Sequence, residues 1–177
     1  MKISPEVKKS LYPILFSAFV ASPIGYFFQW KYQLYENELN IMQEERKVSV
    51  DFLMNVSTLM DERIYEMDKC YKSLKNANSE EEINQRWEAY KTSLNKWNGT
   101  LSKNLALAEF YFSKGLSDQF AETHKSFLAL GKKLDSAKRN NIRGIKVENL
   151  TKDFDNINQQ MSEFLKNGLA EKYAKIK

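Results

Sequence analysis

The sequence contains very few of the residues from which catalytic and metal sites are usually built. Its 177 residues include one cysteine, Cys70, and one histidine, His124. A lone cysteine excludes an internal disulfide and a cysteine-based metal site, and a lone histidine lacks the partners that a metal centre or a nucleophilic dyad needs. The glycines are scattered singly, so a phosphate-binding loop is absent. We therefore expect a protein that is not an enzyme and that uses no cofactor and no metal.

Proline is equally scarce. The three prolines are Pro5, Pro13 and Pro23, and none follows Pro23. Because proline interrupts the interior of helices, its absence from the rest of the chain favours a helical fold. The alternation of apolar and polar residues that is typical of strands is also missing. These absences predict an all-α protein.

Charge is missing from one long segment, the twenty residues from Leu11 to Trp30. A helix of that length spans a hydrocarbon core of about 30 Å. Tyr26, Trp30 and Tyr32 crowd its C-terminal end, where aromatic rings form an interface belt in membrane proteins. We predict a single transmembrane helix over 11–30 that contacts membrane lipid. A cleaved signal peptide and a buried core helix are the alternatives.

Small residues lie four apart along this segment, at Ser17, Ala21 and Gly25. Such spacing lets two membrane helices approach closely, so these positions are candidates for transmembrane helix packing. Orientation follows from the lysines. Three of them precede the span within residues 1–10, whereas Lys31 alone follows it closely. The positive-inside rule places a short N-terminus, 1–10, in the cytoplasm and the rest outside the inner membrane.

Apolar residues after residue 30 recur at intervals of three and four, the pattern of amphipathic helices. The first helix is predicted to run to about Leu74, with Glu38 and Glu45 interrupting its apolar stripe. A loop follows at 75–79, and Ser79 with Glu82 has the spacing of a capping box at the start of the second helix. The stripe of the first helix consists of Leu34, Ile41, Val48, Phe52, Val56, Met60, Ile64, Met67, Tyr71 and Leu74.

Two more helices complete the prediction. Lys114-Gly115 is interpreted as a helix stop and Ser117-Asp118 as the next start. The fourth helix carries apolar residues from Val147 to Leu165 and is predicted to stop at Asn167-Gly168. The expected architecture is a transmembrane helix followed by an elongated antiparallel bundle of about four helices over 31–168. A basic tail, 169–177, ends the chain.

The charge distribution limits the choice of partner. Residues 31–130 carry 13 basic and 16 acidic side chains, and residues 131–177 carry 11 and 6. The basic excess lies at the C-terminal end and matches no nucleic-acid-binding module, so we expect no nucleic-acid partner. It leaves open a reversed topology, in which a cytoplasmic bundle would contact anionic lipid.

The leading functional hypothesis is a structural, accessory or regulatory subunit at a bacterial cell envelope. It would bind another membrane or envelope protein, or a second copy of itself, through an uncovered part of the long helices. The alternative is a periplasmic domain that senses or carries a small ligand in an aromatic bundle core. The positions expected to form the core or the partner surface are Phe52, Val56, Met60, Ile64, Trp87 and Trp97.

Overall fold

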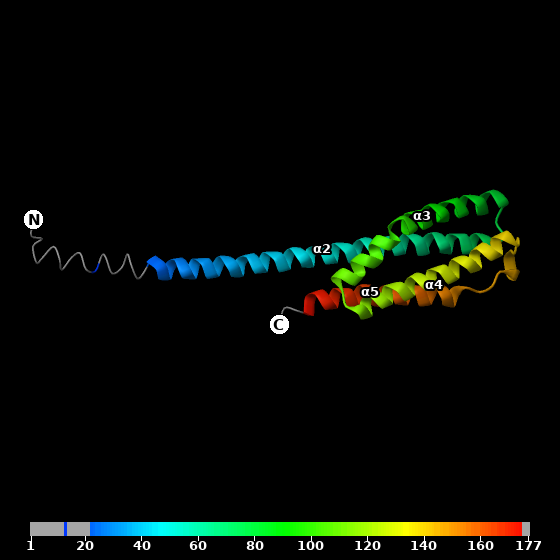
Figure 1. Ribbon diagram of the computed structural model, residues 1–177. Coiled ribbons are helices and arrows are strands. Elements are labelled where there is room, and N and C mark those ends of the chain that lie inside the picture. Colours follow the sequence, from blue (N-terminus) through cyan, green and yellow to red (C-terminus); the bar gives the residue numbers. More distant parts are fainter. Residues whose placement is uncertain (1–12, 14–21, 175–177) are drawn as a thin grey trace, which may run out of the picture. The chain divides into compact units, whose positions relative to one another are not determined.

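The computed structural model describes residue 13 and residues 22–174, and its regular structure there is helical throughout (Figure 1). No strand occurs in this described part of the chain. The predicted all-helical bundle of about four helices is therefore confirmed. The elements are α2 (Ser22–Lys75), α3 (Glu80–Tyr111), α4 (Lys114–Arg139), the 3-10 turn η2 (Gly144–Lys146) and α5 (Thr151–Tyr173).

The chain divides into two compact units, residues 1–47 and 48–177, and α2 contributes to both. In the first unit, residues 22–47 are helical, and nearly all side chains of residues 24–47 are exposed. No helix of the described residues is both long enough and apolar enough to cross a membrane. Half of the predicted span 11–30, with Ser17 and Ala21, lies outside those residues.

The second unit is an antiparallel helical bundle. Contacts between α2 and α3 join residues that are farther apart in sequence the farther they lie from the connecting loop: Cys70 contacts Arg86, and Glu62 contacts Lys96. The aromatic rings of Phe120 in α4 and Phe164 in α5 lie 5.4 Å apart. Four such amphipathic helices bury their apolar faces against one another, which supplies most of the stability of a helical protein.

The loop between α2 and α3 matches the prediction. Ser79 caps α3, and its hydroxyl accepts a hydrogen bond of 3.2 Å from the backbone nitrogen of Glu82. Three acidic residues, 80–82, fill the first turn of α3, where they interact favourably with the helix dipole. The short connection makes α2 and α3 antiparallel neighbours.

The predicted boundaries of the later helices need three corrections. Lys114-Gly115 is not a stop: α3 already ends at Tyr111, and α4 begins at Lys114 because the Ser113 hydroxyl caps it at 3.4 Å from the nitrogen of Leu116. The fourth helix begins at Thr151, not near Val147. Val147 and Leu150 are buried, but they belong to the connection.

The third correction concerns the predicted stop at Asn167-Gly168, since α5 continues to Tyr173. Gly168 is needed for close packing between helices. A β-carbon there would lie 2.8 Å from both terminal methyl groups of Leu53 in α2 and 3.2 Å from Leu116. Residues 169–173 of the predicted basic tail, 169–177, are therefore part of α5.

Candidate functional site

The six predicted core or partner positions lie in the bundle and are buried. Relative exposure is at most 8% for any of them, and Met60 is fully covered. They therefore form part of the interior of the bundle. The residues are Phe52, Val56, Met60, Ile64, Trp87 and Trp97.

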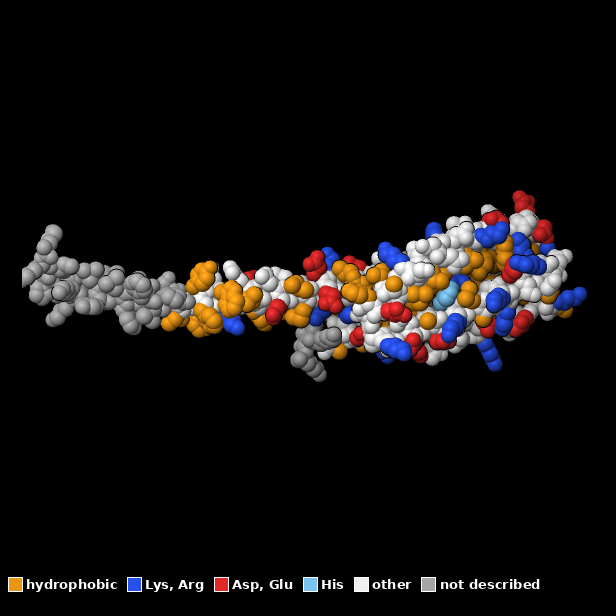
Figure 2. Space-filling model, in the orientation of Figure 1, with side chains coloured by type: hydrophobic (Ala, Val, Ile, Leu, Met, Phe, Trp, Pro, Cys, Tyr) orange, Lys and Arg blue, Asp and Glu red, His pale blue; other side chains and the backbone are white. Residues whose placement is uncertain are grey.

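The residues predicted for the membrane interface are exposed on the first unit. Tyr26, Trp30 and Tyr32 are 76%, 48% and 64% exposed. They belong to a larger exposed apolar group on the first described turns of α2, visible as hydrophobic side chains in Figure 2. Gly25, predicted to pack against another helix, has open space where a side chain would be. We name this group the aromatic segment: Ile24, Tyr26, Phe27, Phe28, Trp30, Tyr32, Leu34 and Tyr35.

The single cysteine of the chain lies inside the bundle. Cys70 is buried, and its Sγ donates to the carbonyl oxygen of Arg86 at 3.1 Å. Burial, reinforced by the nearby charge of Glu66, raises the pKa of the Cys70 thiol to about 12. The thiolate, which is the nucleophilic form, is therefore scarce at neutral pH, so Cys70 is a structural residue.

His124 pairs with a tryptophan. Its Nδ1 accepts a hydrogen bond from Nε1 of Trp97 at 3.1 Å, and the two rings stack with centroids 5.8 Å apart. Burial and, secondarily, the positive charge of Arg63 lower the pKa of His124. The neutral imidazole is the form that fits this arrangement, because a protonated Nδ1 cannot accept the hydrogen bond.

Arg63 is the most unusual side chain in the bundle. It is 1% exposed, and no carboxylate of the described residues forms an ion pair with it. Its Nε and Nη1 are buried without hydrogen-bond partners. Its guanidinium lies over the rings of Phe127 and Trp97, 4.7 and 5.4 Å from their centroids. Burial lowers the pKa of Arg63, and the nearby Tyr90 opposes this shift.

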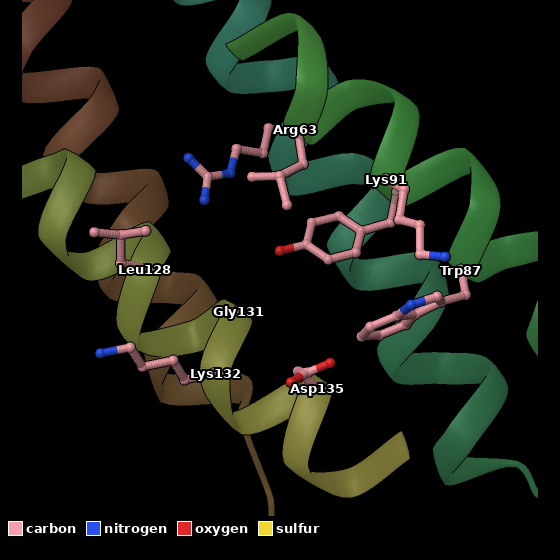
Figure 3. Close-up of a pocket in the computed structure, with 9 residues that line it drawn as sticks. Arg63, Trp87, Lys91, Leu128, Gly131, Lys132 and Asp135 are labelled. Carbon is pink, nitrogen blue, oxygen red and sulfur yellow. The ribbon is translucent and has the colours of Figure 1, made fainter. Parts of the chain in front are cut away.

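A cleft of about 300 Å³ adjoins Arg63, between α3 and α4 (Figure 3). Trp87 comes from α3 on one side and Gly131 from α4 on the other, while Arg63 reaches the cleft from α2. Gly131 leaves room for Tyr90, since a β-carbon there would lie 2.8 Å from the Tyr90 hydroxyl oxygen. We name it the Arg63 cleft, lined by Arg63, Trp87, Tyr90, Lys91, Leu94, Leu128, Gly131, Lys132 and Asp135.

The lining of the Arg63 cleft has more positive than negative charge. Arg63, Lys91 and Lys132 contribute three cationic groups and Asp135 one carboxylate, which leaves a formal charge of +2. Asp135 already forms an ion pair of 2.8 Å with Arg139, and Lys91 forms one of 2.8 Å with Glu88. Lys91 and Lys132 are exposed and point outwards from opposite helices (Figure 3).

A second cleft, of about 580 Å³, lies between α2 and α5. Its charged lining residues are exposed or paired: Lys72, for example, lies 2.6 Å from Asp68. No three His, Cys, Asp or Glu side chains of the described residues gather where they could hold a metal ion. Of these two clefts, the Arg63 cleft is the one lined by a side chain with buried, unpaired polar atoms.

Sequence reasoning overlooked Arg63, although a signal was present. Arg63 follows Met60 by three residues and precedes Met67 by four, so it occupies the buried face of the helix. An arginine on such a face needs a partner, and that requirement marks it as a candidate site residue. Comparisons with models of protein families, with curated proteins and with solved structures found no match to this chain.

Proposed function

We propose that this chain is a membrane-tethered helical bundle that works by binding other proteins at a bacterial cell envelope, and not by catalysis. The observation that carries the proposal is the aromatic segment, which is exposed on its helix and overlaps the end of the uncharged run 11–30. Exposed aromatic rings of this density are unfavourable in water but stable among lipid headgroups.

The proposed arrangement is a single-pass inner-membrane protein. Residues 11–30 would contact lipid, residues 1–10 would lie in the cytoplasm, and the bundle would lie on the periplasmic side. The partner would be another membrane or envelope protein, or a second copy of the chain. Leu34 and Ile41 support a binding face on α2, because they are seven residues apart on one side of a helix and are 41% and 65% exposed.

Topology can be tested with introduced thiols, because the native Cys70 is buried and would react poorly. In a Cys70→Ala background, Ser102→Cys places a thiol on an exposed position of α3, and Ser4→Cys places one before the span. A membrane-impermeant maleimide should label the first variant in intact spheroplasts and the second only after permeabilisation. The opposite pattern would show reversed topology, and release of the protein by carbonate would contradict a membrane span.

The binding face can be tested by photo-crosslinking from the membrane. A photoreactive amino acid at Ile41 should give crosslinks whose mass identifies a second copy or a different envelope protein. Gln43, two residues away and exposed, lies on nearly the opposite side of the helix and serves as the matched control. Equal crosslinking at the two positions, or none at either, would contradict a specific face.

A further inference from the structure

We propose that the Arg63 cleft binds a small organic acid, whose carboxylate pairs with Arg63 while its aromatic or aliphatic body lies between α3 and α4. This inference is independent of the membrane tether and of any protein partner. It rests on the combination of a buried unpaired cation with an adjoining cleft of ligand size.

The burial of Arg63 has a cost that its neighbours compensate only in part. A guanidinium removed from water loses its hydration, and in most proteins a carboxylate or a full set of hydrogen bonds compensates for the loss. Here Phe127 and Trp97 supply cation–π contacts. Two of the guanidinium nitrogens still lack an acceptor.

The guanidinium of Arg63 lacks hydrogen-bond acceptors, and its shape indicates which acceptor would fit. A planar guanidinium presents its N–H groups in a fork that matches the two oxygens of a carboxylate. The two nitrogens without acceptors, Nε and Nη1, are buried beneath the surface of the cleft. Binding therefore includes a small outward movement of the side chains around them, including Tyr90, which lines the cleft with Arg63.

The size and the lining of the cleft indicate what the rest of the ligand would be. Its volume of about 300 Å³ lies at the lower end of the range for small-molecule pockets. Trp87, Tyr90, Leu94 and Leu128 supply aromatic and aliphatic walls. Lys132, which has no ion pair among the described residues, makes its entrance attractive to anions. A monocarboxylate with a single ring fits both the walls and the charge.

The test is calorimetric titration of the full-length chain in neutral detergent with 3-phenylpropionate. Its uncharged amide, 3-phenylpropanamide, has the same ring and chain but no carboxylate. We expect saturable binding of the acid and at least tenfold weaker binding of the amide. Octanoate, titrated in the same way, distinguishes an aromatic acid from a lipid-derived one: it would bind at least as tightly if the natural ligand is a fatty acid.

Two variants assign the contact. Arg63→Met keeps an unbranched side chain in the core but removes the charge, so we expect at least tenfold loss of acid binding without a lower melting temperature. Leu128→Trp fills the cleft from a position that is 42% exposed, and should also abolish binding. Phe110→Trp, 77% exposed on α3 and outside the cleft lining, should bind like the wild type.

The proposal is overturned if no acid binds saturably, or if the amide binds as tightly as the acid. It is also overturned if Arg63→Met binds the acid normally, since the carboxylate would then pair elsewhere. Labelling and carbonate extraction report on the membrane tether separately, so failure here leaves the proposed function to be judged by its own tests.

Discussion

The two parts of α2 use similar apolar side chains in opposite ways. From residue 24 to residue 48, large apolar residues such as Phe28 and Ile41 are exposed. From residue 52 to residue 74, the members of the same stripe are all buried. The apolar pattern of a helix thus shows that one side will be covered, but it does not show whether protein or another medium covers it.

The largest expected loss of stability comes from replacing a buried residue in the bundle part of α2. Met60 and Met42 are both in α2, but Met60 is fully buried and Met42 is 57% exposed. Met60→Ala should lower the free energy of unfolding by about 2–5 kcal/mol because it leaves a cavity. Met42→Ala should change it by less than about 0.5 kcal/mol. Urea denaturation of the full chain in detergent, followed by tryptophan fluorescence, measures both.

Equal losses from the two methionine variants would break the comparison, because they would show that residues before 48 are also packed in the folded protein. Flotation with lipid vesicles provides the complementary measurement. Neither methionine variant should change vesicle binding, whereas replacing Phe28 and Trp30 together by serine should weaken it.

An intermediate loss of stability is expected where α5 packs closely against α2. Gly168→Ala places a β-carbon against Leu53. Overpacking of this kind costs about 1–3 kcal/mol and outweighs the roughly 1 kcal/mol that alanine gains over glycine within a helix. We expect a net loss of about 1 kcal/mol. Gly99 has open space around it, so Gly99→Ala should stabilise the protein. Stabilisation by both would show that α2 and α5 do not approach closely.

The smallest expected effect is a pH dependence confined to the bundle, since the first unit contains no histidine. The pKa of His124 is lower in the folded chain than its ordinary value near 6.5. The unfolded chain therefore binds this proton more readily. The contribution of neutral His124 to the free energy of unfolding is complete above about pH 6.5, and it declines as the pH falls.

The melting temperature should consequently fall more between pH 7 and pH 5.5 in the wild type than in His124→Gln, which cannot titrate at this position. Shared carboxylates contribute to both curves and cancel in the difference. Parallel curves would mean that the proton on His124 is bound equally well in the folded and unfolded chains.

Much of the bundle could be predicted from local patterns. Helical spacing predicted the buried stripe from Phe52 to Leu74, and capping chemistry predicted the Ser79 cap. Both lie where the sequence indicated. The boundary errors arose where one residue type has two uses. Glycine ends many helices, but Gly168 continues α5 because Leu53 requires its missing side chain. Val147 has the helical spacing, yet it is buried in a connection.

The candidate site was harder to foresee because it depends on contacts between distant residues. Trp97 was predicted as a core residue, but its hydrogen bond to His124 joins positions 27 residues apart. The burial of Arg63 could have been read from its position between Met60 and Met67. Its lack of a carboxylate partner could not, because that depends on which acidic residues α3 and α4 bring near it.

The connections at the two ends of the bundle differ in their tolerance to engineering. Only Phe112 and Ser113 separate α3 from α4; one is buried and the other caps a helix. The α4–α5 connection is longer, and Ile145 within it is fully exposed. An epitope or fluorescent domain placed after Ile145 would leave the helix contacts intact, whereas the same insertion at Ser113 would separate two helices that must pack together.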